Sequence, residues 1–90
     1  MTTKIPKHVQ YELAGEWPSE NRNEWLVTLY HYKGGVLVAS VTTTAAGWFE
    51  AVNRAMCTMG KVVEELETTG QLLMDQGDTY IRYGDAVIRA

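Results

Sequence analysis

The sequence predicts an α+β fold in which one long amphipathic helix packs on an antiparallel sheet of four to five strands, in the order ββ(β)-α-β(β). Three observations support this fold class. Apolar residues recur at helical spacing over residues 45–68, two strand-like segments flank Gly34-Gly35, and strand patterns return after the helix. The connection between the hairpin and the helix is very short, so the helix is expected to pack back onto the sheet.

The first quarter of the chain is expected to contain an arm, a strand and a loop. Residues 1–7 are polar and are typical of a flexible N-terminal arm. Residues 8–13 alternate between apolar and polar side chains, as a half-buried strand does. Residues 14–24 are rich in turn formers and predict a loop. Trp17 in this loop is expected to fold back as a lid on the core, with an exposed binding anchor as the alternative.

The clearest strands are residues 25–33 and 36–43, joined by Gly34-Gly35. Both glycines can take positive φ, which is the signature of a tight hairpin turn. The predicted register pairs residues across this turn as follows: Lys33 with Val36, Tyr32 with Leu37, and Tyr30 with Ala39.

This register predicts a sheet with two largely apolar faces. The face assigned to the helix is rich in branched aliphatic side chains and carries Trp25, Val27, Leu29, His31, Val36 and Val38. The other face carries Leu26, Thr28, Tyr30, Tyr32, Leu37, Ala39 and Val41. A sheet with one wet face alternates more cleanly than this, so the second face is also expected to be covered by a protein surface.

The helix is predicted over residues 45–68, with Thr43 or Thr44 as its N-cap and Gly70 just after its end. The side chains expected to be buried are Val52, Ala55, Met59, Val62 and Leu66. A second row of Phe49, Met56 and Val63 widens the apolar arc to roughly 140° at about 100° per residue. Gly47 and Gly60 fall inside this helix, where each lowers its stability by up to ~1 kcal/mol relative to alanine.

Residues 71–90 predict further β structure. The expected elements are a turn at Gln76-Gly77-Asp78, a strand over Thr79–Tyr83, and a second turn at Gly84-Asp85 before residues 86–89. A helical last segment is the alternative.

Composition restricts the class of protein. Ninety residues with a hydrophobic fraction of 46% predict a single domain over residues 1–90. The net charge of −3 disfavours direct nucleic-acid binding, which usually needs a basic patch. The one cysteine, Cys57, excludes an internal disulfide and fits a reducing compartment. No apolar run resembles a signal peptide or a membrane span, so we expect no membrane association and a cytoplasmic location.

No catalytic, metal or nucleotide motif is found in the sequence, so we expect no enzyme activity, no metal and no cofactor. His8 and His31 are not at metal-ligand spacing from Cys, Asp or Glu. Cys57 falls on the polar side of the predicted helix, where Lys61 is one turn away but acidic residues crowd the same side, so we expect a thiol without a catalytic role.

Two surfaces are candidates for binding another protein. The first is the sheet face that carries Leu26, Tyr30, Tyr32 and Leu37, because tyrosine suits a surface that a partner buries. The second is the acidic side of the helix around Glu50 and Glu64, which suits a partner with a basic surface.

These observations favour a small non-enzymatic protein-binding module, namely an inhibitor or regulator that blocks a partner's surface. Phage and mobile-element accessory proteins, including inhibitors of host defence, are often of this build. A structural subunit that forms a homodimer or larger homo-oligomer is the first alternative. The hairpin followed by a helix beginning Gly47-Trp48-Phe49-Glu50-Ala51 is loosely similar to the small domains of HicB-type antitoxins, which adds an antitoxin-like regulator as the second.

Overall fold

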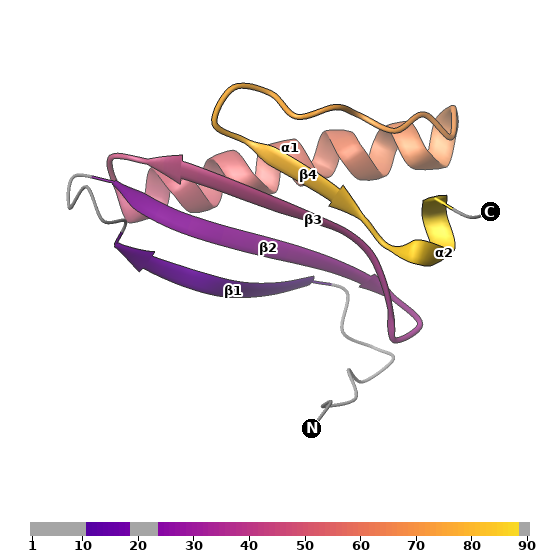
Figure 1. Cartoon of the computed structure of the whole chain (residues 1–90), viewed down its shortest axis with the longest axis horizontal. Helices are drawn as coiled ribbons and strands as arrows, with labels where there is room; N and C mark the ends of the chain where they lie inside the picture. The colour runs from indigo at the N-terminus through magenta and orange to yellow at the C-terminus, as the bar shows by residue number, and fades with distance from the viewer. Residues whose placement is uncertain (1–10, 19–23, 89–90) are drawn as a thin grey trace.

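The computed structural model describes residues 11–18 and 24–88, and these form one antiparallel sheet with a long helix packed on it (Figure 1). The four strands lie in chain order across the sheet: β1 (Tyr11–Pro18), β2 (Trp25–Lys33), β3 (Val36–Ala45) and β4 (Tyr80–Tyr83). The helix α1 (Trp48–Thr68) packs mainly on β2 and β3, and the short helix α2 (Asp85–Ile88) lies against β3. The predicted α+β fold is therefore confirmed, with four strands.

The first strand is longer than the sequence predicted. β1 continues through Pro18, where a loop was expected, and Trp17 lies in the strand opposite Leu26. The pairing with β2 shifts between Ala14 and Trp17, so this stretch forms a β-bulge. Turn-forming residues are tolerated here because β1 is an edge strand with only one neighbour. Residues 1–10 and 19–23, to which the flexible arm, the start of the strand and the middle of the loop were assigned, lie outside the described residues.

The hairpin turn is confirmed, but its register is correct only near the turn. Gly34 and Gly35 have φ values of 61° and 81°, and Lys33–Val36 and Tyr32–Leu37 pair as predicted. The register then shifts, because Val38 bulges out of the ladder and His31 pairs with Ala39. The predicted Tyr30–Ala39 pair is therefore wrong.

The bulge changes which side of the sheet the rest of β3 presents. Ala39 and Val41 move to the face that α1 covers, where both are fully buried. Ser40 and Thr42 take their place on the other face. Val36, which was assigned to the helix-covered face, is 51% exposed beside the turn. The bulge therefore concentrates apolar side chains under the helix and leaves hydroxyl groups on the opposite side.

The predicted N-cap of the helix is wrong. β3 continues through Thr43 and Thr44 to Ala45, and the N-cap is Gly47, in an extended conformation without a side-chain cap. Both threonines are β-branched and fit a strand well. The predicted C-terminal glycine is confirmed, since Gly70 has φ of 71° and its N–H donates to the Glu65 carbonyl at 2.9 Å.

The core lies between α1 and the sheet, with the helix rotated toward Ala51 relative to the prediction. Ala55, Met59 and Val62 are buried as expected, while Val52 and Leu66 are only half-buried. Alanine at position 51 is fully buried and allows close contact with the sheet. In consequence most of the second predicted row lies outside the core: Phe49 and Met56 are exposed, while Val63 is half-buried and packs against the core.

The C-terminal segment ends in a helix, so the alternative to a final strand is confirmed by α2. The turn before β4 is as predicted, with Gly77 at φ of 57° and a bridge between Gln76 and Thr79. The Tyr83 hydroxyl donates to the Leu73 carbonyl at 3.2 Å and accepts from the Leu73 N–H at 2.7 Å. These bonds hold the segment after α1 against the edge of the sheet.

Candidate functional site

An apolar groove with a volume of about 490 Å³ lies between α1 and the first strand. We call it the α1–β1 groove. Tyr11, Leu13 and Leu29 form its floor on the sheet. Val52, Met56 and Gly60 form its wall on the helix, with Met59 at the base. All the lining residues except the glycine have apolar or aromatic side chains, so the surface of the groove is continuously apolar.

The position of α1 explains why this groove is open. The helix packs mainly on β2 and β3, and extensive packing of a helix on β1 is not seen among the described residues. The floor side chains are fixed by strand pairing, with Leu13 opposite Leu29 and the Tyr11 ring stacked on His31 at 4.7 Å. Phe49 and Met56 stand on the adjoining flank of α1 with exposed fractions of 75% and 57%.

The groove continues along α1 toward the turn of the hairpin and becomes polar there. A second hollow of about 220 Å³ shares Tyr11 with it and is lined by His31, Lys33, Val63 and Glu67. A third hollow, of about 260 Å³, shares those last four residues and reaches Leu66 and Val87. From Val52 to Leu66 the concave strip follows about 21 Å of helix at a rise of ~1.5 Å per residue.

The sheet face predicted to bind a partner carries the expected Leu26, Tyr30, Tyr32 and Leu37, all half-buried. We call this side of the sheet the tyrosine face. The rings of Tyr30 and Tyr32 stack with centroids 6.3 Å apart. Burial raises the pKa of Tyr32 above its usual value, and the nearby Glu12 carboxylate adds to this effect.

The tyrosine face is more polar than the sequence predicted, because of the bulge in the hairpin. It carries Ser40, Thr42 and Thr44 in place of the expected Ala39 and Val41. The hydroxyls of Thr28 and Thr42 lie 3.0 Å apart and hydrogen bond to each other. Apolar and polar rows now alternate between the two faces, as they do in a sheet with one face in water. The tyrosine face was expected to be covered by another protein surface because it was predicted to be largely apolar. With these hydroxyl groups on it, that reason for a cover largely disappears.

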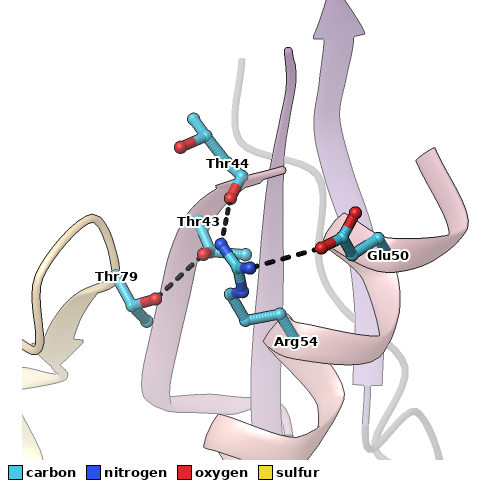
Figure 2. Close-up of polar contacts among 5 residues, drawn as sticks. All are labelled: Thr43, Thr44, Glu50, Arg54 and Thr79. Carbon is cyan, nitrogen blue, oxygen red and sulfur yellow. Dashed lines mark hydrogen bonds and ion pairs between the residues drawn. The ribbon is translucent and has the colours of Figure 1, made fainter. Parts of the chain in front are cut away.

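The acidic candidates on α1 do not form one site. Glu50 and Glu64 are both exposed but 14 residues apart, which corresponds to about 21 Å along a helix. Glu50 forms an ion pair with Arg54 at 3.5 Å, and Arg54 also donates to the Thr44 carbonyl at 2.6 Å (Figure 2). The Glu50 charge is thus partly balanced within the chain, whereas no such pair is seen at Glu64 among the described residues.

The remaining chemistry-bearing side chains are dispersed. Cys57 is exposed on the polar side of α1, and His31 lies in the ring stack with Tyr11. Among residues 11–18 and 24–88, no group of three or more His, Cys, Asp or Glu could hold a metal ion. No helix in the same part of the chain has both the length and the apolar character needed to cross a membrane.

No protein-family model matches the chain, and neither a curated protein nor a solved structure is significantly similar to it. Function is therefore inferred from the surfaces themselves.

The groove was not predicted from the sequence, although one signal for it was present. An apolar arc of roughly 140° is wider than a single helix–sheet contact needs, and the excess becomes the exposed flank of Phe49 and Met56. The floor residues Tyr11 and Leu13 could not be assigned to it, because which strand lies beside the helix is set by tertiary structure.

Proposed function

We propose that this chain is a non-enzymatic protein-binding module that acts by covering a surface of a partner protein, as an inhibitor or regulator does. The observation that supports this proposal is the exposed apolar flank of α1 beside the α1–β1 groove. Met56 and Tyr11, with exposed fractions of 57% and 49%, line this concave apolar surface, and Phe49, 75% exposed, lies two turns before Met56 on the same helix. Contiguous apolar patches on a protein surface usually mark a site that another molecule buries.

The shape of this surface favours a protein over a small molecule. Small ligands are usually enclosed on most sides. Here the concave strip is long and runs along α1, a helix that also exposes Phe49. Aromatic residues and methionine are enriched where proteins meet, and the flexible methionine side chain adapts to the shape of a partner.

The test is affinity capture from cells that naturally contain the protein, using the wild-type chain, Met56→Glu and Cys57→Glu. Cys57 is the next residue on α1 and is exposed on its polar side, so its variant adds the same charge away from the groove. We expect the same partner with the wild-type and Cys57→Glu chains, and its loss with Met56→Glu. The purified partner should then bind the wild-type chain in calorimetry. A partner that binds all three forms equally, or the absence of any partner, would contradict the proposal.

A homo-oligomeric subunit is the second candidate, because β1 is an edge strand whose outer side has no neighbour in the described sheet. However, β1 contains a bulge and ends at Pro18, and both features discourage a second strand from pairing with an edge. Light scattering of the purified chain distinguishes the two candidates, since a stable monomer is incompatible with an oligomeric subunit.

A further inference from the structure

The tyrosine face is left open by the elements around it. α1 packs on the opposite face of the sheet, over the buried core. The segment around Leu73 bonds to Tyr83, which pairs with the buried Ala39 on that same side. α2 contributes Val87 to a hollow that Leu66 of α1 also lines, so it lies on the α1 side as well. In the described part of the chain, these elements leave the tyrosine face available for contact.

One row of side chains crosses this face from edge to edge. Strand pairing brings four residues into line, one from each strand: Glu12, Tyr30, Ser40 and Arg82. Residues that pair in an antiparallel sheet point to the same side, so all four belong to the tyrosine face. The Glu12 carboxylate is also close enough to Tyr32 to raise the pKa of that phenol. The row therefore has an acid at the β1 edge and a base at the β4 edge.

A two-fold axis that runs along the strands, between β2 and β3, would place this row over the same row of a second copy. Rotation about this axis reverses the order of the strands, so β1 faces β4 of the second copy and β2 faces its β3. The rotation causes no shift along the strands, so every row stays over itself. Sheets that pack face to face lie about 10 Å apart with their strands nearly aligned.

The charges of the row match in this arrangement. Glu12 of one copy faces Arg82 of the second, and the same contact occurs again at the other edge, as in any isologous interface. Both side chains are exposed in the single chain, and together they are long enough to meet across a gap of about 10 Å. Each acid therefore gains a base, and each base an acid.

The sizes and hydroxyl groups between these charges match as well. Tyr30 faces Ser40 of the second copy, so a large side chain lies over a small one that is only 7% exposed among its neighbours. In the next row Thr28 faces Thr42. The hydroxyls of these two threonines already hydrogen bond to each other within each copy, so covering them does not leave them without a partner.

Charge disfavours other occupants of this face. A two-fold axis across the strands would place β1 over β1 of the second copy, which brings Glu12 toward Glu12 and Arg82 toward Arg82. Like charges that face each other are unfavourable. The Glu12 and Arg82 charges balance within one copy, so a strongly acidic or strongly basic partner gains little at this face.

We infer that the chain forms a two-fold symmetric dimer through the tyrosine face, with the two sheets inside and the two α1 helices outside. This inference goes beyond the proposed partner-binding function. The α1–β1 groove of each copy lies on the outer side of its sheet and stays open in the dimer. Because an isologous contact closes on itself, assembly stops at two copies.

The size of the face predicts a dimer that dissociates on dilution. The nine residues of β2 extend over about 30 Å at ~3.3 Å per residue, and four strands at ~4.8 Å are roughly 19 Å wide. β4 has only four residues, so the face is shorter at that edge. Its area is at the low end of specific interfaces, to which each partner usually contributes about 800 Å².

The experiment is sedimentation equilibrium of the full chain over a range of concentrations. We expect the wild type to pass from monomer to dimer between about 1 μM and about 1 mM. Glu12→Arg places like charges opposite each other at both edges, and we expect it to weaken the dimer at least tenfold while the chain stays folded by circular dichroism. The exchange Glu12→Arg/Arg82→Glu restores opposite charges and should restore the dimer to within threefold of wild type.

The matched control is Glu64→Arg, which makes the same change of charge at an exposed position of α1. The chain carries a net charge of −3, so either single change lowers the general repulsion between copies. General electrostatics therefore predict stronger association for both variants, whereas the tyrosine-face dimer predicts weaker association for Glu12→Arg and no loss for Glu64→Arg. A monomer at every concentration up to about 1 mM, an assembly larger than two copies, or equal association of wild type and Glu12→Arg would overturn the inference.

Two variants separate this inference from the proposed function. Met56→Glu should stay dimeric and lose the captured partner, while Glu12→Arg should become monomeric and keep it. If the wild type is a monomer whose partner requires Met56, the partner-binding function stands and the dimer is wrong. If the dimer behaves as expected but no partner is captured, the dimer stands and the proposed function is wrong.

Discussion

The hydroxyl groups of Thr43 and Thr79 lie 2.9 Å apart in a buried hydrogen bond that joins β3 to the turn before β4 (Figure 2). The two residues are far apart in the sequence, and each satisfies the other's hydroxyl inside the protein. In the sequence, α1 lies between these two threonines. The bond therefore helps to hold β4, the short fourth strand, against β3 at the edge of the sheet.

Removing both members of this pair should cost less than the sum of the two single removals. Thr43→Val leaves the Thr79 hydroxyl buried without this partner, and we expect a loss of about 1–3 kcal/mol in the free energy of unfolding. The double variant Thr43→Val/Thr79→Val should lose less than the sum of the two single changes. Urea unfolding of the four proteins measures this, and strictly additive losses would show that the hydroxyls are not coupled.

Two glycines should respond to alanine in opposite directions. Gly60→Ala places its methyl group in open space on α1, and we expect a gain of up to ~1 kcal/mol in the free energy of unfolding. At Gly84 the new Cβ would overlap the Leu37 carbonyl oxygen, so Gly84→Ala should lose about 1–3 kcal/mol. Urea midpoints of the two variants test the pair, and a loss at Gly60 or a gain at Gly84 would contradict it.

Two methionines on α1, one buried and one exposed, test how the helix is rotated on the sheet. Met59 is 1% exposed, so Met59→Ala should cost about 2–5 kcal/mol by opening a cavity. Met56 is 57% exposed, so Met56→Ala should change the free energy of unfolding by less than about 0.5 kcal/mol. Similar losses at both positions in urea unfolding would show that α1 is rotated differently on the sheet.

The pH dependence of unfolding should report on Tyr83. Burial raises the pKa of Tyr83 above its ordinary value of 10.0, although the hydrogen bond that its oxygen accepts from the Leu73 N–H acts in the opposite direction. Below pH 10 both folded and unfolded chains keep the proton, and stability is unaffected. Above it the unfolded chain loses the proton first, so the free energy of unfolding falls as pH rises. Tyr83→Phe should flatten this decline between pH 9 and 11, and an unchanged slope would contradict the assignment.

The sequence predicted the elements better than it predicted how they face one another. Gly34-Gly35 located the hairpin turn because only positive φ closes so tight a link. The bulge at Val38 was not predictable from the alternation, since Leu37, Val38, Ala39 and Val41 are all apolar and fit either register. One shifted residue exchanges the two faces of the strand beyond it.

The same limit applies to the candidate site. Helical spacing located α1 within three residues of its start, but the apolar arc was wider than the sheet contact and did not reveal how α1 is rotated. The tyrosines were visible in the sequence as a possible binding face. The groove was not, because it depends on Tyr11 and Leu13 lying beside Met56, an arrangement that only the packed structure provides.

The tyrosine face remains a predicted binding surface, and one pair of substitutions decides between it and the α1–β1 groove. Tyr30→Glu and Tyr32→Glu each add a charge to half-buried positions outside the core, among threonine and serine hydroxyls. We expect both variants to stay folded by circular dichroism and to bind the captured partner within threefold of the wild-type affinity, because the partner contacts the other side of the sheet. Loss of partner binding by folded variants, with normal binding by Met56→Glu, would place the partner on the tyrosine face instead.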